Sequence, residues 1–267
     1  MILDEILEHK RGELAERQAR VPRSQIEAQS RAAGPARDFH AALRTPGVAL
    51  IAEIKRQSPA KGALRLNMDA PSMATTYAAA GAAAISVLTD ARYFKGSDDD
   101  LVAVRAAVEV PVLRKDFVVD PYQVYEARAI GADAVLLIVR ALSKSEIEEL
   151  GALAHSLGMA ALVEAHTADE VDVALDAGAT LLGINNRDLT RMVVDVATTE
   201  ALRPLVPAGV TVVSESGIRT ADDIARLRAI GVDAALIGEA LVTGPDADAL
   251  VRELVAAGRV PANAGAK

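Results

Sequence analysis

The sequence predicts a (β/α)8 barrel with an N-terminal helical extension, and two periodic features carry this prediction. From Val48 onward, eight short segments rich in Val, Ile and Leu alternate with longer amphipathic segments, the pattern of parallel strands joined by helices. Eight strand-helix units make a closed barrel. Glycines that suit a helix end also recur before the second, fourth, sixth and eighth apolar segments, at Gly81, Gly131, Gly178 and Gly231. A doubly wound open sheet, the alternative topology, does not predict this even spacing.

The eight predicted strands are nearly continuous apolar runs, as expected for parallel strands that are covered on both faces. In chain order they are VALIAEIK ending at Lys55, AAISVLT ending at Thr89, PVLRKDF ending at Phe117, AVLLIV ending at Val139, MAALVEA ending at Ala165, LLGIN ending at Asn185, TVVSES ending at Ser216 and AALIGE ending at Glu239. Residues 48–258 therefore form the predicted barrel.

The first 45 residues lie outside this repeat and predict a helical extension packed on the barrel, within one domain spanning residues 1–267. Their apolar positions form a helical stripe beside charged residues, made of Ile2, Leu3, Ile6, Leu7 and Leu14. A frayed tail is the alternative. Residues 259–267 are mostly small or Pro and predict a flexible tail, because they would bury little area.

Composition excludes several classes of protein. A hydrophobic content of 51% in 267 residues supports a sizeable core, and a net charge of −8 disfavours broad binding to nucleic acid. The chain has no cysteine, so disulfides and thiol chemistry are excluded. The first residues do not resemble a secretory signal, and no apolar run reaches the roughly 18 residues of a membrane span. We expect a soluble cytoplasmic protein with no membrane partner.

No metal site is predicted. The histidines, His9, His40, His155 and His166, are scattered, without the i, i+4 pairing or carboxylate partners that a metal would need. Acidic residues at 98–100 open a predicted helix, where they complement the helix dipole better than they suggest magnesium. The nucleophile-elbow and P-loop motifs are also absent.

Ionisable residues interrupt the apolar strands near their carboxyl ends. Glu53 and Lys55 lie on one side of the first strand, Lys115 follows PVLR in the third, Glu164 follows AALV in the fifth, and Glu215 ends the seventh. Any single pair, such as Glu53 with Lys55 or Lys115, could serve only to neutralise buried charge. The odd-numbered strands nevertheless all bring charge to one rim, where barrel active sites assemble. Asn185 closes the sixth strand at the same rim.

A separate signal predicts phosphate binding. Ser216 and Gly217 lie where the seventh strand ends, just before a helix, and Gly238 and Glu239 lie where the eighth ends. Loops at these two positions form the usual phosphate cradle of a barrel. The alternative is that the glycines serve only tight turns.

Several motifs resemble the indole-3-glycerol phosphate synthase family, in the same order and over essentially the whole chain. They are AEIKRQSPAKG at 52–62, LRKDFVVDPYQVYEARAIGADAVLL from Leu113, LVEAH from Leu162, GINNRDL from Gly183, VSESGI from Val213 and IGEALV from Ile237. A related barrel, phosphoribosylanthranilate isomerase, would share the phosphate loops but not the combination of Lys55, Lys115 and Glu164.

The resemblance implies a cofactor-free ring closure in tryptophan biosynthesis. The substrate would be 1-(2-carboxyphenylamino)-1-deoxyribulose 5-phosphate, and the products indole-3-glycerol phosphate, carbon dioxide and water. Lys115 would be the general acid, aided by a carboxylate such as Glu53, while Glu164 would stabilise cationic intermediates and accept the proton of rearomatisation. Lys55 would pair with the substrate carboxylate and share the acid role in dehydration. The division of labour between the two lysines stays open.

Other residues match family positions around the substrate. These are Asn185 and Glu215, which hold the substrate and the catalytic side chains; Ser216, Gly217, Gly238 and Glu239 in the phosphate loops, assisted by Arg56; Ser58 and Pro59 in the mobile loop; and Arg187 and Leu189 in the wall. Glu239 stands where a serine is often found, so only its backbone N–H should contact phosphate. Phe94, Phe117 and Leu136 are expected to form the slot for the aromatic ring, with core packing as the alternative.

Two rival functions stay open: another phosphosugar isomerase or epimerase barrel, and a non-catalytic sugar-phosphate-binding barrel. The first would need only a carboxylate base, and the second would tolerate loss of the acid and base that this chain retains. No coiled coil or interface stripe predicts an oligomer, so a monomer is the working expectation, and other enzymes of the tryptophan pathway stay open as partners.

Overall fold

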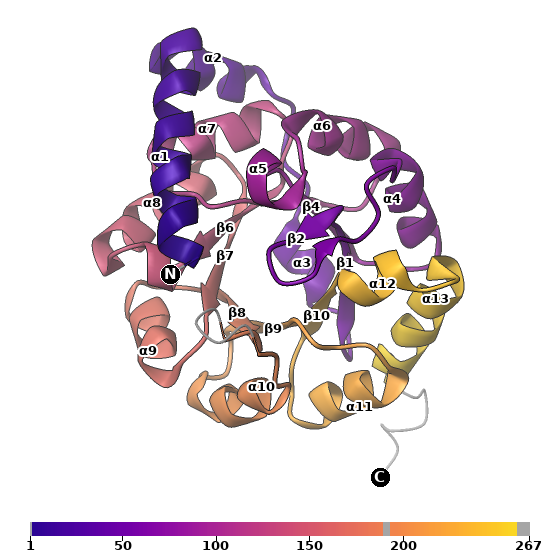
Figure 1. The fold of residues 1–267 in the computed structure, drawn as a ribbon. Coiled ribbons are helices and arrows are strands. Elements are labelled where there is room, and N and C mark those ends of the chain that lie inside the picture. The colour runs from indigo at the N-terminus through magenta and orange to yellow at the C-terminus, as the bar shows by residue number, and fades with distance from the viewer. Residues whose placement is uncertain (1, 189–192, 261–267) are drawn as a thin grey trace.

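Eight parallel strands close into a barrel in the computed structural model, which describes residues 2–188 and 193–260 (Figure 1). Around the barrel they are β1 (Ala49–Ile54), β4 (Ala84–Leu88), β5 (Val112–Lys115), β6 (Ala134–Ile138), β7 (Ala160–Ala165), β8 (Leu181–Asn185), β9 (Thr211–Glu215) and β10 (Ala234–Ile237). The pairing of β1 with both β4 and β10 closes the sheet. The predicted barrel is thus confirmed, and the open-sheet alternative is wrong.

Six of the eight strands end one or two residues before the predicted positions. The largest differences are at β5, which ends at Lys115 rather than Phe117, and at β10, which ends at Ile237 rather than Glu239. Glu239 instead begins a helix. The hydrogen bonds between strands stop where the chain turns at the rim of the barrel. A strand therefore ends earlier than its apolar run predicts.

Helices follow the strands and cover the outside of the barrel (Figure 1). The described ones are α4 (Ala70–Ala79), α5 (Ala91–Phe94), α6 (Asp98–Ala107), α7 (Pro121–Ala129), η1 (Val139–Ala141), α8 (Lys144–Ser156), α9 (Ala168–Asp176), α10 (Ala197–Leu202), η2 (Arg203–Leu205), α11 (Ala221–Ala229), α12 (Glu239–Thr243) and α13 (Ala247–Gly258). Most begin at a Ser, Thr or Asp whose side chain accepts a backbone N–H of the first turn, as at Ser143, Thr167 and Thr220.

The four recurring glycines all have positive φ, from +75° at Gly231 to +105° at Gly81. Each lies one residue after the cap that ends α4, α7, α9 or α11, and turns the chain into the next strand. The predicted helix-end role of these glycines is therefore confirmed.

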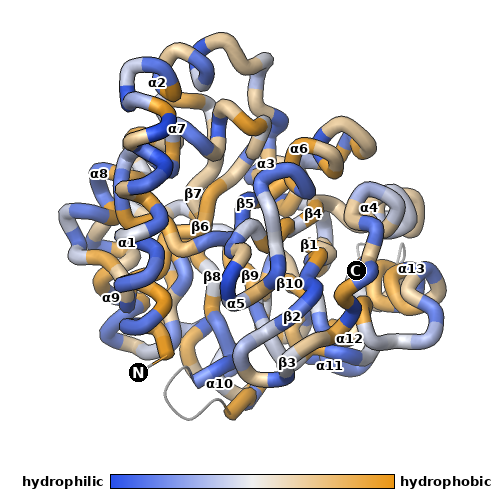
Figure 2. The backbone as a smooth tube through the Cα atoms, turned by 45° about the horizontal axis from the view of Figure 1, so that its top comes forward, coloured by the Kyte–Doolittle hydropathy of each residue, from blue (hydrophilic) through white to orange (hydrophobic). Residues whose placement is uncertain are grey.

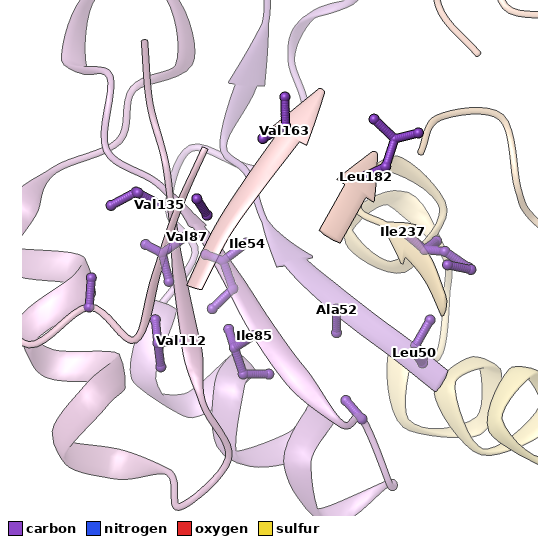
Figure 3. Close-up of a cluster of buried hydrophobic side chains, with 14 of the residues drawn as sticks. Leu50, Ala52, Ile54, Ile85, Val87, Val112, Val135, Val163, Leu182 and Ile237 are labelled. Carbon is purple, nitrogen blue, oxygen red and sulfur yellow. The ribbon is translucent and has the colours of Figure 1, made fainter. Parts of the chain in front are cut away.

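Alternate residues of each strand face opposite sides of the sheet. Leu50, Ala52 and Ile54 of β1 lie in the cluster between strands and helices (Figure 3), whereas Ala49 and Ile51 pack inside the barrel. The interior also holds Leu113, Leu162 and Val213 of β5, β7 and β9. By the same alternation the residues two positions later, at the carboxyl ends of these strands, point into the mouth of the barrel.

The N-terminal extension forms α1 (Ile2–Arg20), α2 (Arg23–Ala32) and α3 (Phe39–Leu43). Leu3, Ile6, Leu7 and Leu14 of the predicted stripe are buried, and polar and apolar stretches alternate along α1 (Figure 2). α2 packs against α7, and Phe39 and Leu43 of α3 are buried in the barrel interior. A packed helical extension is confirmed, and a frayed tail is wrong.

A short hairpin of β2 (Gln57–Ser58) and β3 (Gly62–Ala63) lies between β1 and α4. At the other end of the chain, Arg259 bridges Gly47, and its carbonyl oxygen accepts a hydrogen bond of 2.8 Å from Arg228. The predicted tail therefore does not begin at residue 259, and residues 261–267 lie outside the described part of the chain. Within 2–188 and 193–260, no helix has the length and apolar content of a membrane span.

Candidate active site

A cavity of about 410 Å³ opens at the carboxyl ends of the barrel strands, within the size range of small-molecule sites. Most residues selected from the sequence line it. They are Glu53, Lys55, Ser58, Pro59, Phe94, Lys115, Phe117, Leu136, Glu164, Asn185, Arg187, Glu215, Ser216, Gly217, Gly238 and Glu239. Leu189 lies outside the described residues.

Lys115 lies at the centre of the ionic contacts in this cavity. Its Nζ is 2.7 Å from Glu164 Oε2 and 2.9 Å from Glu215 Oε2. Burial alone would lower the pKa of Lys115, but the charges of the two carboxylates outweigh it and raise that pKa above its usual value. The side chain is therefore a cation at neutral pH that has an anionic proton acceptor within hydrogen-bond distance.

Of the two lysines left open as partners of Glu53, the structure has Lys55. Glu53 Oε1 accepts a hydrogen bond of 2.6 Å from Lys55 Nζ. Glu53 acts on Lys115 only through its charge at longer range. Lys55 is two residues from Glu53 and therefore lies on the same face of the strand. Lys115 instead reaches the carboxylates of Glu164 on β7 and Glu215 on β9.

Glu164 and Glu215 have opposite pKa shifts although both are buried. Burial would raise the pKa of Glu164, but Lys115 and His166 hold it well below its usual range, helped by a hydrogen bond with Asn185. Burial raises the pKa of Glu215 to about 7, since Lys115 only partly offsets it and the neighbouring charge of Glu164 adds to it. Such a divergent pair of carboxyl groups is a common basis for acid and base roles.

Two glycines that were not selected for this purpose, one inside β8 and one directly after β10, make room for the carboxylates of Glu215 and Glu53. A Cβ on Gly183 of β8 would collide with Glu215 Oε1, and a Cβ on Gly238 would collide with Glu53 Oε1. Gly183 was missed as a functional residue. A glycine inside an apolar strand is the available signal, because it often marks a close approach.

The loops after β9 and β10 form one end of the cavity. Ser216 and Gly217 have φ values of +68° and +84°, an unusual backbone for Ser that local structure must hold in place. Two cations missed by the sequence reasoning, Lys61 and Arg219, line the cavity as well. Arg219 donates a hydrogen bond of 2.9 Å to Glu239 Oε1, so the Glu239 side chain binds a cation at this rim.

Arg56 does not occupy the place expected for it. It is absent from the cavity lining, and its guanidinium pairs with Asp100 and donates to the Met68 carbonyl at 3.0 Å. Asp100 opens α6 as predicted, but it also binds this arginine. The structure thus has Arg56 paired with the start of α6 rather than lining the cavity.

The opposite end of the cavity is apolar. The rings of Phe94 and Phe117 have centroids 6.1 Å apart, and Leu136 lines the same cavity. Ile2 and Ile6 of α1 also contribute to the wall, which sequence reasoning did not foresee. The extension therefore forms part of the site itself.

His166 corrects the expectation that no histidine has carboxylate partners. Its Nδ1 lies 3.0 Å from Glu170 Oε2, and its Nε2 lies 3.4 Å from Glu164 Oε1. Sequence spacing to Glu170 was the available signal, since the pair is four residues apart across the start of α9. In the described part of the chain no group of three or more His, Asp or Glu residues has the arrangement of a metal site.

Comparisons with known proteins agree over nearly the whole chain. The sequence profile of a family described as indole-3-glycerol phosphate synthase matches residues 3–254. A relative of that name from a Roseiflexus species is 53% identical, covering 95% of this chain and 97% of the relative. A second relative, indole-3-glycerol phosphate synthase 1 from Streptomyces coelicolor, is 51% identical, covering 98% of this chain and 97% of the relative.

Solved structures support the architecture. KGPDC from Streptococcus mutans superposes with a TM-score of 0.62 at 14% identity, covering 79% of this chain and 97% of that chain. A 3-hexulose-6-phosphate synthase superposes with a TM-score of 0.60 at 19% identity, covering 79% of this chain and 99% of that chain. At such identities the likeness shows the barrel fold alone.

Proposed function

The chain belongs to the indole-3-glycerol phosphate synthase family, and from this premise we propose how its residues close the indole ring. The reaction converts 1-(2-carboxyphenylamino)-1-deoxyribulose 5-phosphate into indole-3-glycerol phosphate, carbon dioxide and water. The observation that carries the proposal is the position of Lys115 between Glu164 and Glu215, at 2.7 and 2.9 Å. It supplies a proton donor and a proton acceptor side by side.

The cavity suggests an orientation for the substrate. The phosphate binds the backbone N–H groups of the loops around Ser216, Gly217 and Gly238, near the cations Lys61 and Arg219. The aromatic ring lies in the apolar slot at the other end. Lys55, close to Glu53 on β1, pairs with the carboxylate of the substrate.

Ring closure begins when the aryl carbon that bears the carboxylate attacks the ketone carbon. Lys115 donates a proton to the ketone oxygen as the carbon–carbon bond forms. The bond to the carboxylate then breaks, carbon dioxide leaves, and its electron pair restores the aromatic ring. Glu164, held ionised by its neighbours, stabilises the cationic intermediates.

Dehydration completes the indole. A second proton, donated by Lys55, converts the hydroxyl into leaving water. Glu164 accepts the carbon proton that is lost as the five-membered ring becomes aromatic. Glu215 keeps Lys115 oriented between these steps through its hydrogen bond.

The test is to mix the purified chain with the anilino-deoxyribulose phosphate and follow indole fluorescence, which the absence of Trp makes easy to detect. Lys115→Ala and Glu164→Gln should each lower kcat by about 10²- to 10⁴-fold while substrate still binds. Lys144→Ala, at a half-exposed lysine of α8, is the control that should retain turnover. Substrate binding without any indole signal would instead favour a non-catalytic sugar-phosphate-binding barrel.

We also propose a cytoplasmic location, supported by a cysteine-free sequence that suits a reducing compartment. A monomer is proposed as well. Fractionation of the source cells and analytical ultracentrifugation test these two statements.

A further inference from the structure

Asn186 is a buried polar residue that the ring-closure mechanism does not use. It directly follows Asn185, the last residue of β8, and only 2% of its surface is exposed. Asn185 lines the cavity and Asn186 does not, as expected from the alternation of side chains along an extended chain. A buried amide needs partners for its donors and its acceptor. The partners of Asn186 connect β9, the loop after it and α10.

The Asn186 side chain closes a ring of hydrogen bonds with Ser214 of β9 and Thr199 of α10. Its Nδ2 donates to Ser214 Oγ at 3.1 Å, and its Oδ1 accepts from Thr199 Oγ1 at 2.8 Å. Thr199 thereby uses its one hydroxyl proton, so Ser214 is the donor in the 2.7 Å bond between the two hydroxyl groups. All three residues are buried, and hydrogen bonds linked in this way strengthen one another at low dielectric.

The amide oxygen of Asn186 also supports the start of α10. The cap residue of this helix is Val196, whose side chain accepts no hydrogen bond, so a backbone N–H of the first turn needs another acceptor. Asn186 Oδ1 accepts the Thr199 N–H at 3.0 Å. Because this oxygen accepts from both the backbone and the hydroxyl of Thr199, it must face α10. The Nδ2 group must therefore face β9 and the loop after it.

The second hydrogen on Nδ2 holds the loop that follows β9. It is donated to the Ser216 carbonyl oxygen at 2.9 Å. Ser216 has a φ of +68°, a left-handed conformation that is unfavourable for a residue with a side chain. Gly217 follows with a φ of +84°, and a Cβ there would lie 2.6 Å from a methyl carbon of Val194. The hydrogen bond from Asn186 thus stabilises a strained and closely packed loop.

The carbonyl of Ser216 and the N–H of Gly217 belong to one peptide group. That group is trans and planar, so its N–H points opposite to its carbonyl. The carbonyl faces Asn186, which lies outside the cavity, and the N–H therefore faces the side on which Ser216 and Gly217 line the cavity. If Ser216 relaxed to a negative φ, this peptide group would rotate and its N–H would leave that side.

We propose that Asn186 is a positioning residue for the phosphate of the substrate; this inference rests on the proposed function. It holds the peptide group between Ser216 and Gly217 in the orientation that presents an N–H to the cavity. The ring with Ser214 and Thr199 keeps the donating Nδ2 group aimed at that loop. The affinity for phosphate therefore depends on hydrogen bonds made behind the wall of the cavity.

The test compares the binding of two non-reactive ligands to wild type and to Asn186→Leu by calorimetry. Both are the alcohol made by reducing the ketone of the proposed substrate, one with its 5-phosphate and one without. Leu has a shape close to that of Asn but no hydrogen-bonding group. We expect Kd to rise about tenfold for the phosphorylated ligand, the effect of roughly one hydrogen bond to a charged group. Kd for the ligand without phosphate should be unchanged.

Steady-state assays give a second readout. KM for the phosphorylated substrate should rise in Asn186→Leu while kcat stays close to wild type, because the phosphate is bound alike in the ground state and the transition state. Should Asn186→Leu not fold, Asn186→Ala leaves room for water beside the Ser216 carbonyl and should show the same pattern in both measurements.

Thr199→Val separates positioning from loss of stability. It removes a hydroxyl group from the ring but retains the hydrogen bond between Asn186 and the Ser216 carbonyl. The urea concentration at the midpoint of unfolding should fall in both Thr199→Val and Asn186→Leu, because each leaves buried polar groups without partners. Only Asn186→Leu should weaken phosphate binding. Asn67→Leu, at an exposed asparagine, is the matched control and should behave as wild type.

The positioning role is overturned if Asn186→Leu binds the phosphorylated ligand as tightly as wild type does, or if both ligands weaken equally. It is also overturned if Thr199→Val weakens phosphate binding as much as Asn186→Leu does. Inorganic phosphate, used as a third ligand, keeps this test separate from the proposed function. If wild type binds inorganic phosphate but makes no indole, the proposed function fails, and the Kd of Asn186→Leu for inorganic phosphate still decides the role of Asn186.

Discussion

Two neighbouring residues of β5, Arg114 and Lys115, belong to different ionic clusters on opposite sides of the same strand. We define the catalytic cluster as Lys55, Lys115, Glu53, Glu164 and Glu215, and the docking cluster as Lys10, Arg17, Asp98, Arg114, Asp116 and Glu126. The first lies in the mouth of the barrel, whereas the second lies beneath α1, and Asp116 lines both cavities. Their charges are of the same kinds, so charge alone does not tell them apart.

Space and hydrogen bonding separate the two clusters. The docking cluster encloses a cavity of only about 10 Å³, against about 410 Å³ at the catalytic cluster. Arg114 donates to Glu126 at 2.8 Å, Asp98 at 3.0 Å, the Thr89 hydroxyl at 3.2 Å and the Gln123 carbonyl at 3.2 Å. In the catalytic cluster Glu215 Oε1 lacks such a partner within the described structure. Buried charged groups that lack a hydrogen-bond partner and lie beside a cavity indicate a reactive or binding site. Buried charged groups with all their hydrogen bonds made and no space beside them indicate a structural role.

The largest expected effects come from substituting Arg114 and Lys115 one at a time. Arg114→Met should destabilise the fold by about 3–5 kcal/mol, because it removes the fully buried cation that the carboxylates of Asp98, Asp116 and Glu126 share and leaves them to Lys10 and Arg17 alone. Lys115→Ala should act mainly on kcat, by about 10²- to 10⁴-fold. Urea unfolding and the indole assay on both variants measure the contrast.

Arg252→Met, at an exposed pair with Asp248, controls for loss of an ordinary ion pair and should unfold at close to the wild-type urea concentration. The distinction between the clusters breaks down if Arg114→Met unfolds at the wild-type urea concentration, or if Lys115→Ala retains near wild-type turnover.

A smaller effect tests whether the catalytic cluster depends on space. Gly183→Ala pushes the Glu215 carboxylate away from its present position, and a displacement of about 1 Å in a catalytic site can cost roughly 10²-fold in kcat. Gly12→Ala, at an exposed glycine of α1 with no atom near its Cβ position, should leave kcat unchanged and stabilise α1 by about 0.5–1 kcal/mol. A Gly183→Ala enzyme with normal kcat and an unshifted pH profile would show that Glu215 has freedom to move.

The smallest expected effect is on the pH dependence of stability, which differs in sign between the two clusters. Burial would raise the pKa of Asp116 in the docking cluster, but Lys10 and Arg114 lower it to about 2. A folded-state pKa below the unfolded value of about 3.9 means that this stabilisation is present above that pH and is lost as pH falls through about 2. Its size is roughly 2–3 kcal/mol.

Glu215 has the opposite sign, because its pKa is raised to about 7. Its contribution to stability is present below the unfolded value of about 4.3 and is lost as pH rises through about 7. The free energy of unfolding, measured with urea between about pH 3 and pH 8, should therefore vary less with pH in the acidic range in Asp116→Asn. In Glu215→Gln it should vary less with pH in the neutral range. Parallel curves for both variants and wild type would contradict the assignment.

Several details of the site could not be predicted because they depend on which elements meet. Lys115 lines the cavity, as expected from its place in β5, but its two ion-pair partners could not be identified, since Glu164 and Glu215 lie 49 and 100 residues away in sequence. Arg56 was expected to assist phosphate binding, and its pairing with Asp100 of α6 could not be read from the sequence. His166 appeared to have no carboxylate partners because Glu170 belongs to the next helix and Glu164 faces it only after β7 is in place.

The sequence by itself determined the barrel, the packed extension and the strand ends that carry charge. These features follow from local patterns: apolar runs, helix-end glycines, and ionisable residues on the inward-facing side of a strand. Only the tertiary structure decided which carboxylate meets which lysine, and which of two adjacent cations on β5 has a ligand-sized cavity beside it. The physical reason is closure of the barrel, because joining β1 to β10 completes the ring that brings distant strand ends into one buried volume.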